Sequence, residues 1–210
     1  MGIVRKSLKK TGTIEKILIA AEREISVCGF DGATVDNIAR QSGVTKQLVY
    51  HYFKSKAHLY RAVLERASQE SQLLDKIDFY SRLSPEDGIR HFVNDLFDEL
   101  IKHPSSTTFL LDQALHSGEH ITQSSRFIPT TRVYISKIIT PILQRGSDAG
   151  QFKADLDPDI SFWMIFHLVA ACFLHQKIMS EVSPQDFSSD AGIDLWRTST
   201  TRFILDSLSG

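Results

Sequence analysis

The stretch of residues 34–56, TVDNIARQSGVTKQLVYHYFKSK, constrains the fold of this chain more than any other part of it. Thr34 can cap a short helix whose apolar residues recur at helical spacing, and Thr45 can cap a second helix. Gly43 lies between them, where a tight turn needs a positive φ angle. In the second helix Val49 faces inward and the polar residues are left facing outward. A plain amphipathic hairpin would share some of these features, but their agreement favours a DNA-binding helix-turn-helix.

Polar residues at the start of the second helix and after it are placed to meet DNA. Lys46 and Gln47 stand at its exposed N-terminal end, where Lys can pair with guanine and Gln with adenine in the major groove. His51 lies one turn further on and is expected to touch a base or a phosphate. Lys56 falls in the first turn of a helix capped by Ser55, where a cation is unfavourable unless a phosphate lies nearby.

Residues 17–64 resemble the N-terminal domain of TetR-type transcriptional regulators. The resemblance is specific over these residues and architectural beyond them, although a Gly-x-Phe…Asp-Pro passage at residues 150–158 extends it weakly. The matching residues are Ile17, Ala20, Ala21, Gly29, Phe30, Thr34, Val35, Ile38, Ala39, Ser42, Gly43, Val44, Val49, Tyr50, His51, Tyr52, Phe53, Ser55, Lys56 and Leu59.

The resemblance implies roles for further side chains. Tyr50 and Lys56 are expected to contact phosphates, and Thr45 to lie at the edge of the groove. Thr34 is expected to meet the DNA backbone at the start of its helix, while Tyr52 fits either a phosphate contact or packing on the first helix. The predicted DNA-contacting residues are therefore Thr34, Thr45, Lys46, Gln47, Tyr50, His51 and Lys56.

Charge divides the chain in two. The 210 residues carry a net charge of −1, but residues 1–66 hold 12 Lys and Arg against 6 Asp and Glu, and the remainder holds 12 against 19. A basic front and an acidic back suit a domain on nucleic acid followed by a domain with another task. We expect a DNA-binding domain over residues 1–60, a linking helix to about residue 75, and a ligand-binding and dimerisation domain over 76–210.

Almost every segment has the periodicity of a helix, and strand alternation is absent. The predicted fold class is all-α, with a three-helix N-terminal domain and a C-terminal helical bundle. Ser84-Pro85 is a strong helix start, and Pro141 is expected to kink the helix that contains it. Beyond the helix-turn-helix, helices are predicted over residues 13–28, 55–74, 84–103, 106–116, 129–146, 157–179 and 193–208.

The resemblance implies a homodimer that binds a pseudo-palindromic operator and is released from it by a small molecule. The last two helices are expected to form a four-helix interface with a second subunit; burial within a monomer is the alternative. Aromatic residues in the bundle favour an apolar or aromatic effector, although such stripes also build ordinary cores. The candidate ligand-binding residues are Phe92, Phe97, Asp112, Gln113, His116, Trp163, Phe166 and His167.

One motif points to metal chemistry. His116-Ser-Gly-Glu119-His120 matches the H-x-x-E-H spelling of some metalloproteases, but Gly118 interrupts the helix that would align its ligands. A metal-sensing regulator using these three residues stays open as an alternative, and a metal-dependent hydrolase is a weaker one. Cys172 and His175 lie three apart and could join a metal site, but a buried core cysteine is favoured. We expect neither an enzyme nor a bound cofactor.

The ends and the cysteines bear on location. Cys28 and Cys172 fall in different predicted domains, which argues against a disulfide and fits a reducing cytoplasm. The basic start at residues 5–10 is followed by polar residues, so we expect no signal peptide; it is either a solvated tail or an arm that contacts DNA. The apolar window at residues 160–174 is judged too short to cross a bilayer.

Overall fold

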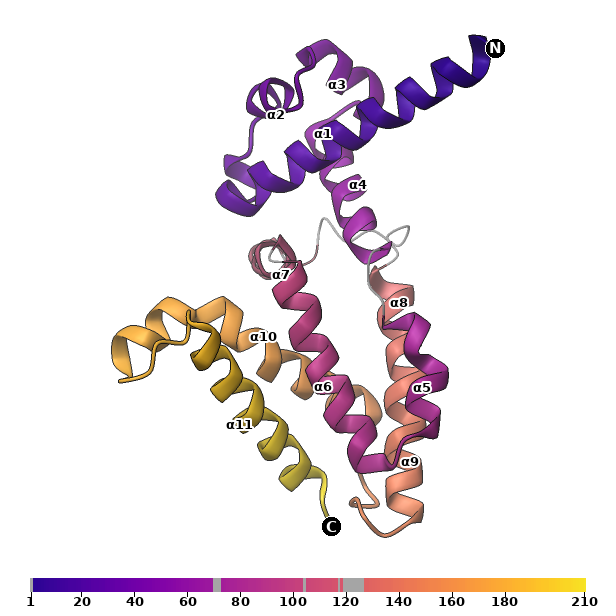
Figure 1. The fold of residues 1–210 in the computed structure, drawn as a ribbon, viewed down its shortest axis with the longest axis vertical. Coiled ribbons are helices and arrows are strands. Elements are labelled where there is room, and N and C mark those ends of the chain that lie inside the picture. The colour runs from indigo at the N-terminus through magenta and orange to yellow at the C-terminus, as the bar shows by residue number, and fades with distance from the viewer. Residues whose placement is uncertain (1, 70–72, 104, 117, 119–126) are drawn as a thin grey trace. The chain divides into compact units, whose positions relative to one another are not determined.

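The computed structural model describes residues 2–69, 73–103, 105–116, 118 and 127–210 (Figure 1). Within these ranges the chain is helical, and its sole β feature is an isolated antiparallel bridge between Phe152 and Ser209. The all-α prediction is confirmed. The chain forms two compact units, one made of residues 1–70 with 104–128 and the other of residues 71–103 with 129–210.

The first unit surrounds an apolar cluster that includes Ile17, Ile38, Val49 and Tyr60, each at most 1% exposed. Helix α1 is longer than predicted at both ends, and it contains a kink where Gly29 has a φ of 68°. The basic start of the chain is therefore helical backbone continuous with α1. The helices of this unit are α1 (Gly2–Gly32), α2 (Val35–Ser42), α3 (Lys46–Phe53), α4 (Lys56–Gln69) and α7 (Ser105–Leu115).

Helix α7 belongs to the first unit, although the sequence-based division placed its residues in the C-terminal domain. It packs against α1, and its Phe109 is buried in the same apolar cluster as Tyr60. The Phe109 and Tyr60 rings meet edge to face at 5.7 Å. Sequence order did not reveal this placement, because it depends on side chains that are about fifty residues apart.

The second unit has its own core around Phe92 and Phe97, which are fully buried. Phe92 contacts the ring of Phe162 at 6.3 Å, and Phe97 contacts that of Phe173 at 5.9 Å. Ser84 accepts a hydrogen bond from the Asp87 amide and caps α6, as predicted. The elements of this unit are η1 (Leu74–Lys76), α5 (Ile77–Arg82), α6 (Pro85–Lys102), α8 (Phe127–Tyr134, from its third residue), η2 (Ile135–Ile139), α9 (Thr140–Asp148), α10 (Pro158–Val182) and α11 (Asp190–Leu208).

The predicted interruption near Pro141 takes the form of a π-helical turn, η2, directly before it. The amide of Thr140 donates to the carbonyl of Ile135, five residues back. Proline has no amide hydrogen and its ring crowds the preceding turn, so the helix widens there. Helix α9 then continues to Asp148.

Helix α10 is longer than predicted. The expectation that its apolar segment is too short to cross a bilayer is wrong, because the helix is long and apolar enough to span one by length and composition. The helix has 25 residues, and 28% of its most apolar window is buried inside the structure. One such helix is weak evidence for a membrane span. Ile160, Met164, Ile178 and Val182 of this helix are nevertheless exposed in this chain.

Arg145 holds the end of α5 in the second unit. Its guanidinium donates to the carbonyl oxygens of Tyr80, Ser81 and Leu83 at 3.2, 3.0 and 2.8 Å. These carbonyls lie at the C-terminus of α5, where the last carbonyls of a helix lack an intrahelical donor; that of Tyr80 also accepts from the Leu83 amide at 3.3 Å. The side chain therefore joins α9 to α5 and satisfies three acceptors at once.

We predict that Arg145→Ala lowers the free energy of unfolding by about 1–3 kcal/mol, because three carbonyls lose a charged donor. Urea unfolding followed by circular dichroism measures this loss. Arg132→Ala, which removes an exposed arginine from neighbouring α8, is the matched control and should change stability little. Equal midpoints for the two variants would contradict the role of Arg145.

Candidate DNA-binding site

The helix-turn-helix forms at the predicted residues. Thr34 Oγ1 accepts from the Asn37 amide at 3.2 Å, and Thr45 Oγ1 accepts from the Leu48 amide at 3.3 Å, so both threonines are N-caps. Gly43 ends α2 with a φ of 69° and a ψ of 29°, in the left-handed region where other residues are strained. Lys54, which ends α3 with a φ of 60°, is a positive-φ residue that the sequence did not reveal.

Helix α3 presents the polar face that the sequence predicted. Val49 is 1% exposed and anchors the helix in the core, whereas Lys46, Gln47, Tyr50 and His51 are exposed. Thr34 and Thr45 are also exposed at the starts of their helices. Six of the seven predicted residues therefore lie on open surface of the first unit, and Lys56 is partly buried.

Lys46 is engaged by an acid on the preceding helix. Its ammonium lies 2.7 Å from the Asp36 carboxylate, and this hydrogen bond raises the pKa of Lys46. Both side chains are largely exposed, so the pair contributes little to stability. It does fix where the Lys46 charge lies before DNA arrives. The ammonium has three N–H donors, so Lys46 can contact a base or phosphate either beside Asp36 or in exchange for it.

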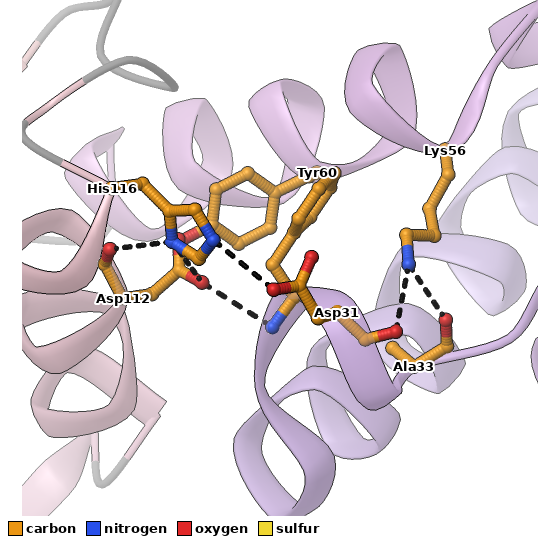
Figure 2. Close-up of polar contacts among 7 residues, drawn as sticks. Asp31, Ala33, Lys56, Tyr60, Asp112 and His116 are labelled. Carbon is orange, nitrogen blue, oxygen red and sulfur yellow. Dashed lines mark hydrogen bonds and ion pairs between the residues drawn. The ribbon is translucent and has the colours of Figure 1, made fainter.

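Lys56 is the first residue of α4, and its side chain reaches the junction between α1 and α2. This junction, residues 29–34, is called here the α1–α2 corner. The Lys56 ammonium donates to the carbonyl oxygens of Asp31 and Ala33, both at 3.1 Å (Figure 2). It also lies 4.5 Å from the centre of the Phe30 ring. The cation predicted to meet phosphate thus also holds the backbone from which α2 begins.

Glu24 on α1 is a contributor that sequence reasoning missed. This carboxylate is 7% exposed and accepts from Asn37 Nδ2 at 2.8 Å and from Gln41 Nε2 at 2.7 Å. It fixes the face of α2 that turns toward α1. No local signal could have found it, because its partners are 13 and 17 residues away.

The eight predicted ligand-binding residues are divided between the two units. Asp112, Gln113 and His116 lie on or beside α7 in the first unit, where they hydrogen-bond to other residues of that unit. The other five lie in the second unit. Phe92 and Phe97 are core, Phe166 is partly buried, and Trp163 and His167 are exposed on α10.

A groove of about 740 Å³ opens elsewhere in the second unit, between α6 and α11. None of the eight predicted residues lines it. Its walls carry charges of both signs, which include Arg90 and Glu86 from α6 and Arg202 and Asp206 from α11. Its size suits a small molecule, but the mixed charge selects no particular class.

The metal alternative finds no support in the described residues. Glu119 and His120 lie outside them, and His116 contacts Asp31 and Asp112. Cys172 is buried, which raises the pKa of its thiol to about 11, and it behaves as a core residue. Among the described residues no group of three His, Cys, Asp or Glu side chains is arranged to hold a metal ion.

Comparison with known proteins places both parts of the chain. Residues 17–63 match the family described as bacterial regulatory proteins, tetR family, and residues 85–204 match the tetracyclin repressor-like C-terminal domain. The transcriptional repressor NicS of Pseudomonas putida is 27% identical over 168 residues, 79% of this chain and 76% of that protein.

Solved structures show the same fold. The transcriptional regulator SCO4942 from Streptomyces coelicolor superposes with a TM-score of 0.67 at 22% identity, covering 93% of this chain and 98% of that one. The regulator FadR from Bacillus subtilis, solved with stearoyl-CoA, superposes with a TM-score of 0.64 at 18% identity, covering 92% and 98%. At these identities the similarity shows the fold alone.

We predict that Gln47→Ala costs about 1–3 kcal/mol of operator binding and relaxes the choice of base at one position in each half-site. Gln47 is exposed at the start of α3, where a base contact is predicted. Competition assays with single-base operator variants measure the effect. Equal losses on operator and random DNA would contradict a base-reading role.

We predict that Lys56→Ala weakens binding to operator and random DNA alike and flattens the salt dependence by about one counterion. Because Lys56 also donates to two carbonyls of the α1–α2 corner, the variant should lose about 1–2 kcal/mol of unfolding free energy. Salt titrations and urea unfolding separate the two effects. A stability loss with an unchanged salt slope would leave Lys56 a structural residue only.

Proposed function

The chain belongs to the tetR family of bacterial transcriptional regulators, and we propose that it is a homodimeric repressor that a small-molecule effector releases from a pseudo-palindromic operator. The family supplies the DNA-binding regulatory function. Repression, the operator symmetry, the dimer and the effector are the parts proposed for this chain.

The exposed polar face of α3 carries the proposal. Val49 and the caps at Thr34 and Thr45 fix the helix, and Lys46 and Gln47 project from its N-terminal end. A recognition helix that enters the major groove reads few base pairs, so specific binding requires a second copy. Two copies related by a twofold axis read half-sites separated by one helical turn of DNA or a multiple of it.

An apolar stripe on α10 supports dimerisation. Ile160, Met164, Ile178 and Val182 recur at helical spacing and are 56%, 64%, 67% and 80% exposed. Phe203 on α11 is 63% exposed. Apolar residues repeated along one face of a helix are covered by another surface in a folded protein. A second copy of the same two helices is the proposed cover.

The effector is proposed to bind the second unit, with Phe92, Phe97, Trp163, Phe166 and His167 as candidate contacts. A protein of the same fold, FadR, has been solved with a small molecule, stearoyl-CoA. For this chain we propose an apolar or aromatic molecule, on the weight of aromatic side chains in this unit. Asp112, Gln113 and His116 receive a different role below.

Selection from random-sequence duplex DNA with the purified full-length chain tests the proposed function. Enrichment of one inverted repeat, bound at moderate salt far more tightly than random duplex, is the expected result. Binding that depends on salt but not on sequence would contradict it. The enriched duplex then serves as the probe in a screen for compounds that release the protein.

We predict that Phe203→Asp converts the dimer to a monomer and lowers operator affinity on the order of a hundredfold, because the second half-site is no longer linked to the first. Sedimentation velocity and gel-shift titration measure the two effects. Val27→Asp is the matched control, since Val27 is 84% exposed on α1 in the first unit. Dimers that persist in Phe203→Asp would contradict the proposed interface.

A further inference from the structure

Helix α7 is tied to the DNA-binding helices by a buried carboxylate. Asp112 is 4% exposed, and it accepts from the Tyr60 hydroxyl on α4 at 2.5 Å and from the Phe30 amide on α1 at 3.3 Å (Figure 2). Burial, followed by the bond to Asp112, raises the pKa of Tyr60, so the phenol stays a donor. One side chain thus joins α7 to the α1–α2 corner and to the start of α4.

His116, directly after α7, extends this connection to Asp31. Its Nδ1 lies 2.9 Å from the backbone oxygen of Asp112 and 3.3 Å from Asp112 Oδ1. Its Nε2 lies 3.2 Å from Asp31 Oδ2 at the α1–α2 corner. Figure 2 shows the ring between the two acids, with one nitrogen turned to each.

The protonation state of His116 follows from this geometry. A neutral imidazole carries one N–H, so one of its nitrogens would turn a lone pair toward an oxygen acceptor. An imidazolium donates from both nitrogens and satisfies both contacts. The Asp112 backbone oxygen above all, and then the Asp31 carboxylate, raise the pKa of His116, in agreement with the geometry.

We propose that protonated His116 is a positioning residue for DNA binding, which bridges α7 to Asp31 at the α1–α2 corner and neutralises that carboxylate beside the DNA-binding face. The proposal rests on the proposed function and adds a regulation of the same site. Operator binding favours the protonated form, and operator affinity therefore falls as pH rises.

The charge near the corner explains the link to DNA. Asp31 is 82% exposed at the side chain, and its backbone oxygen accepts from Lys56, a predicted phosphate contact. A bare carboxylate there repels the phosphate backbone, and the imidazolium cancels that charge. Because binding of phosphates and binding of the proton favour each other, the coupling is reciprocal.

Among the described residues, four titratable groups bear on the charge of His116. Asp31 and Asp112 favour its charged form, and Tyr60 stays neutral in its bond to Asp112. Lys56 opposes that form, and both groups contact the Phe30 ring: Lys56 is 4.5 Å and the His116 ring 6.1 Å from its centre. The Asp112 backbone oxygen and the two carboxylates together outweigh Lys56, consistent with the raised pKa of His116.

The direction of the pH dependence follows from the raised pKa of His116. The bridge is fully present below the ordinary histidine value of about 6.5 and is lost as pH rises through the higher value of the folded protein. We expect operator affinity of the natural chain to fall about two- to fivefold between about pH 6 and about pH 8.5 through this group. His116→Gln and Asp31→Asn should each remove that component.

Gel-shift titrations with the selected operator across this pH range give the result. His58→Gln is the matched control, because His58 lies in the same unit but bonds Ser55, the residue before α4, and not α7. It should keep the pH dependence of the natural chain. Identical pH profiles for the natural chain and His116→Gln would overturn the proposal.

Thermal unfolding without DNA separates this proposal from the proposed function. The natural chain should melt above His116→Gln at about pH 6, and the difference should vanish by about pH 8.5. Melting differences that do not change with pH overturn the imidazolium bridge, whether or not an operator has been found. Failure to select an operator would instead count against the proposed function, while the melting comparison still tests the bridge.

Discussion

A carboxylate buried at 4% exposure has to be matched by donors, and the arrangement of the first unit depends on how Asp112 meets that requirement. Its donors come from α1 and α4, the two helices that flank the helix-turn-helix in the chain. Unpaired, the same charge would cost several kcal/mol, on the order of the 3–5 kcal/mol lost when a buried pair is broken. The position of α7 on the DNA-binding helices is therefore specified by polar chemistry as well as by the packing of Phe109.

The α1–α2 corner joins that requirement to DNA recognition. Thr34 ends the corner and caps α2, and α2 in turn supports α3. Lys56 reaches the corner from α4, while Phe30 and Asp31 are reached from α7 and the residue after it. A change in the position of α7 would therefore shift the corner from which the DNA-binding helix α2 begins, and binding of DNA would shift the position of α7.

Local signals made part of this molecule predictable. Thr34, Gly43 and Thr45 specify their own turns within three or four residues, and the alternation of Val49 with polar neighbours specifies which face of α3 is open. The roles of Asp112 and His116 were not predictable, because their partners lie 52 to 85 residues away in the chain. The sequence placed both residues among the candidate ligand contacts because they fall within the predicted C-terminal domain. Their hydrogen bonds instead join them to residues of the first unit.

Hydroxyl-radical footprinting of the full-length chain on its selected operator tests the account most directly. Two protected segments related by a twofold axis, with centres about one helical turn apart or a multiple of it, are the predicted result. That pattern requires two copies of α3 in major grooves on one face of the duplex. A single protected segment, or uniform protection that shifts freely along the DNA, would contradict a dimeric, sequence-reading regulator.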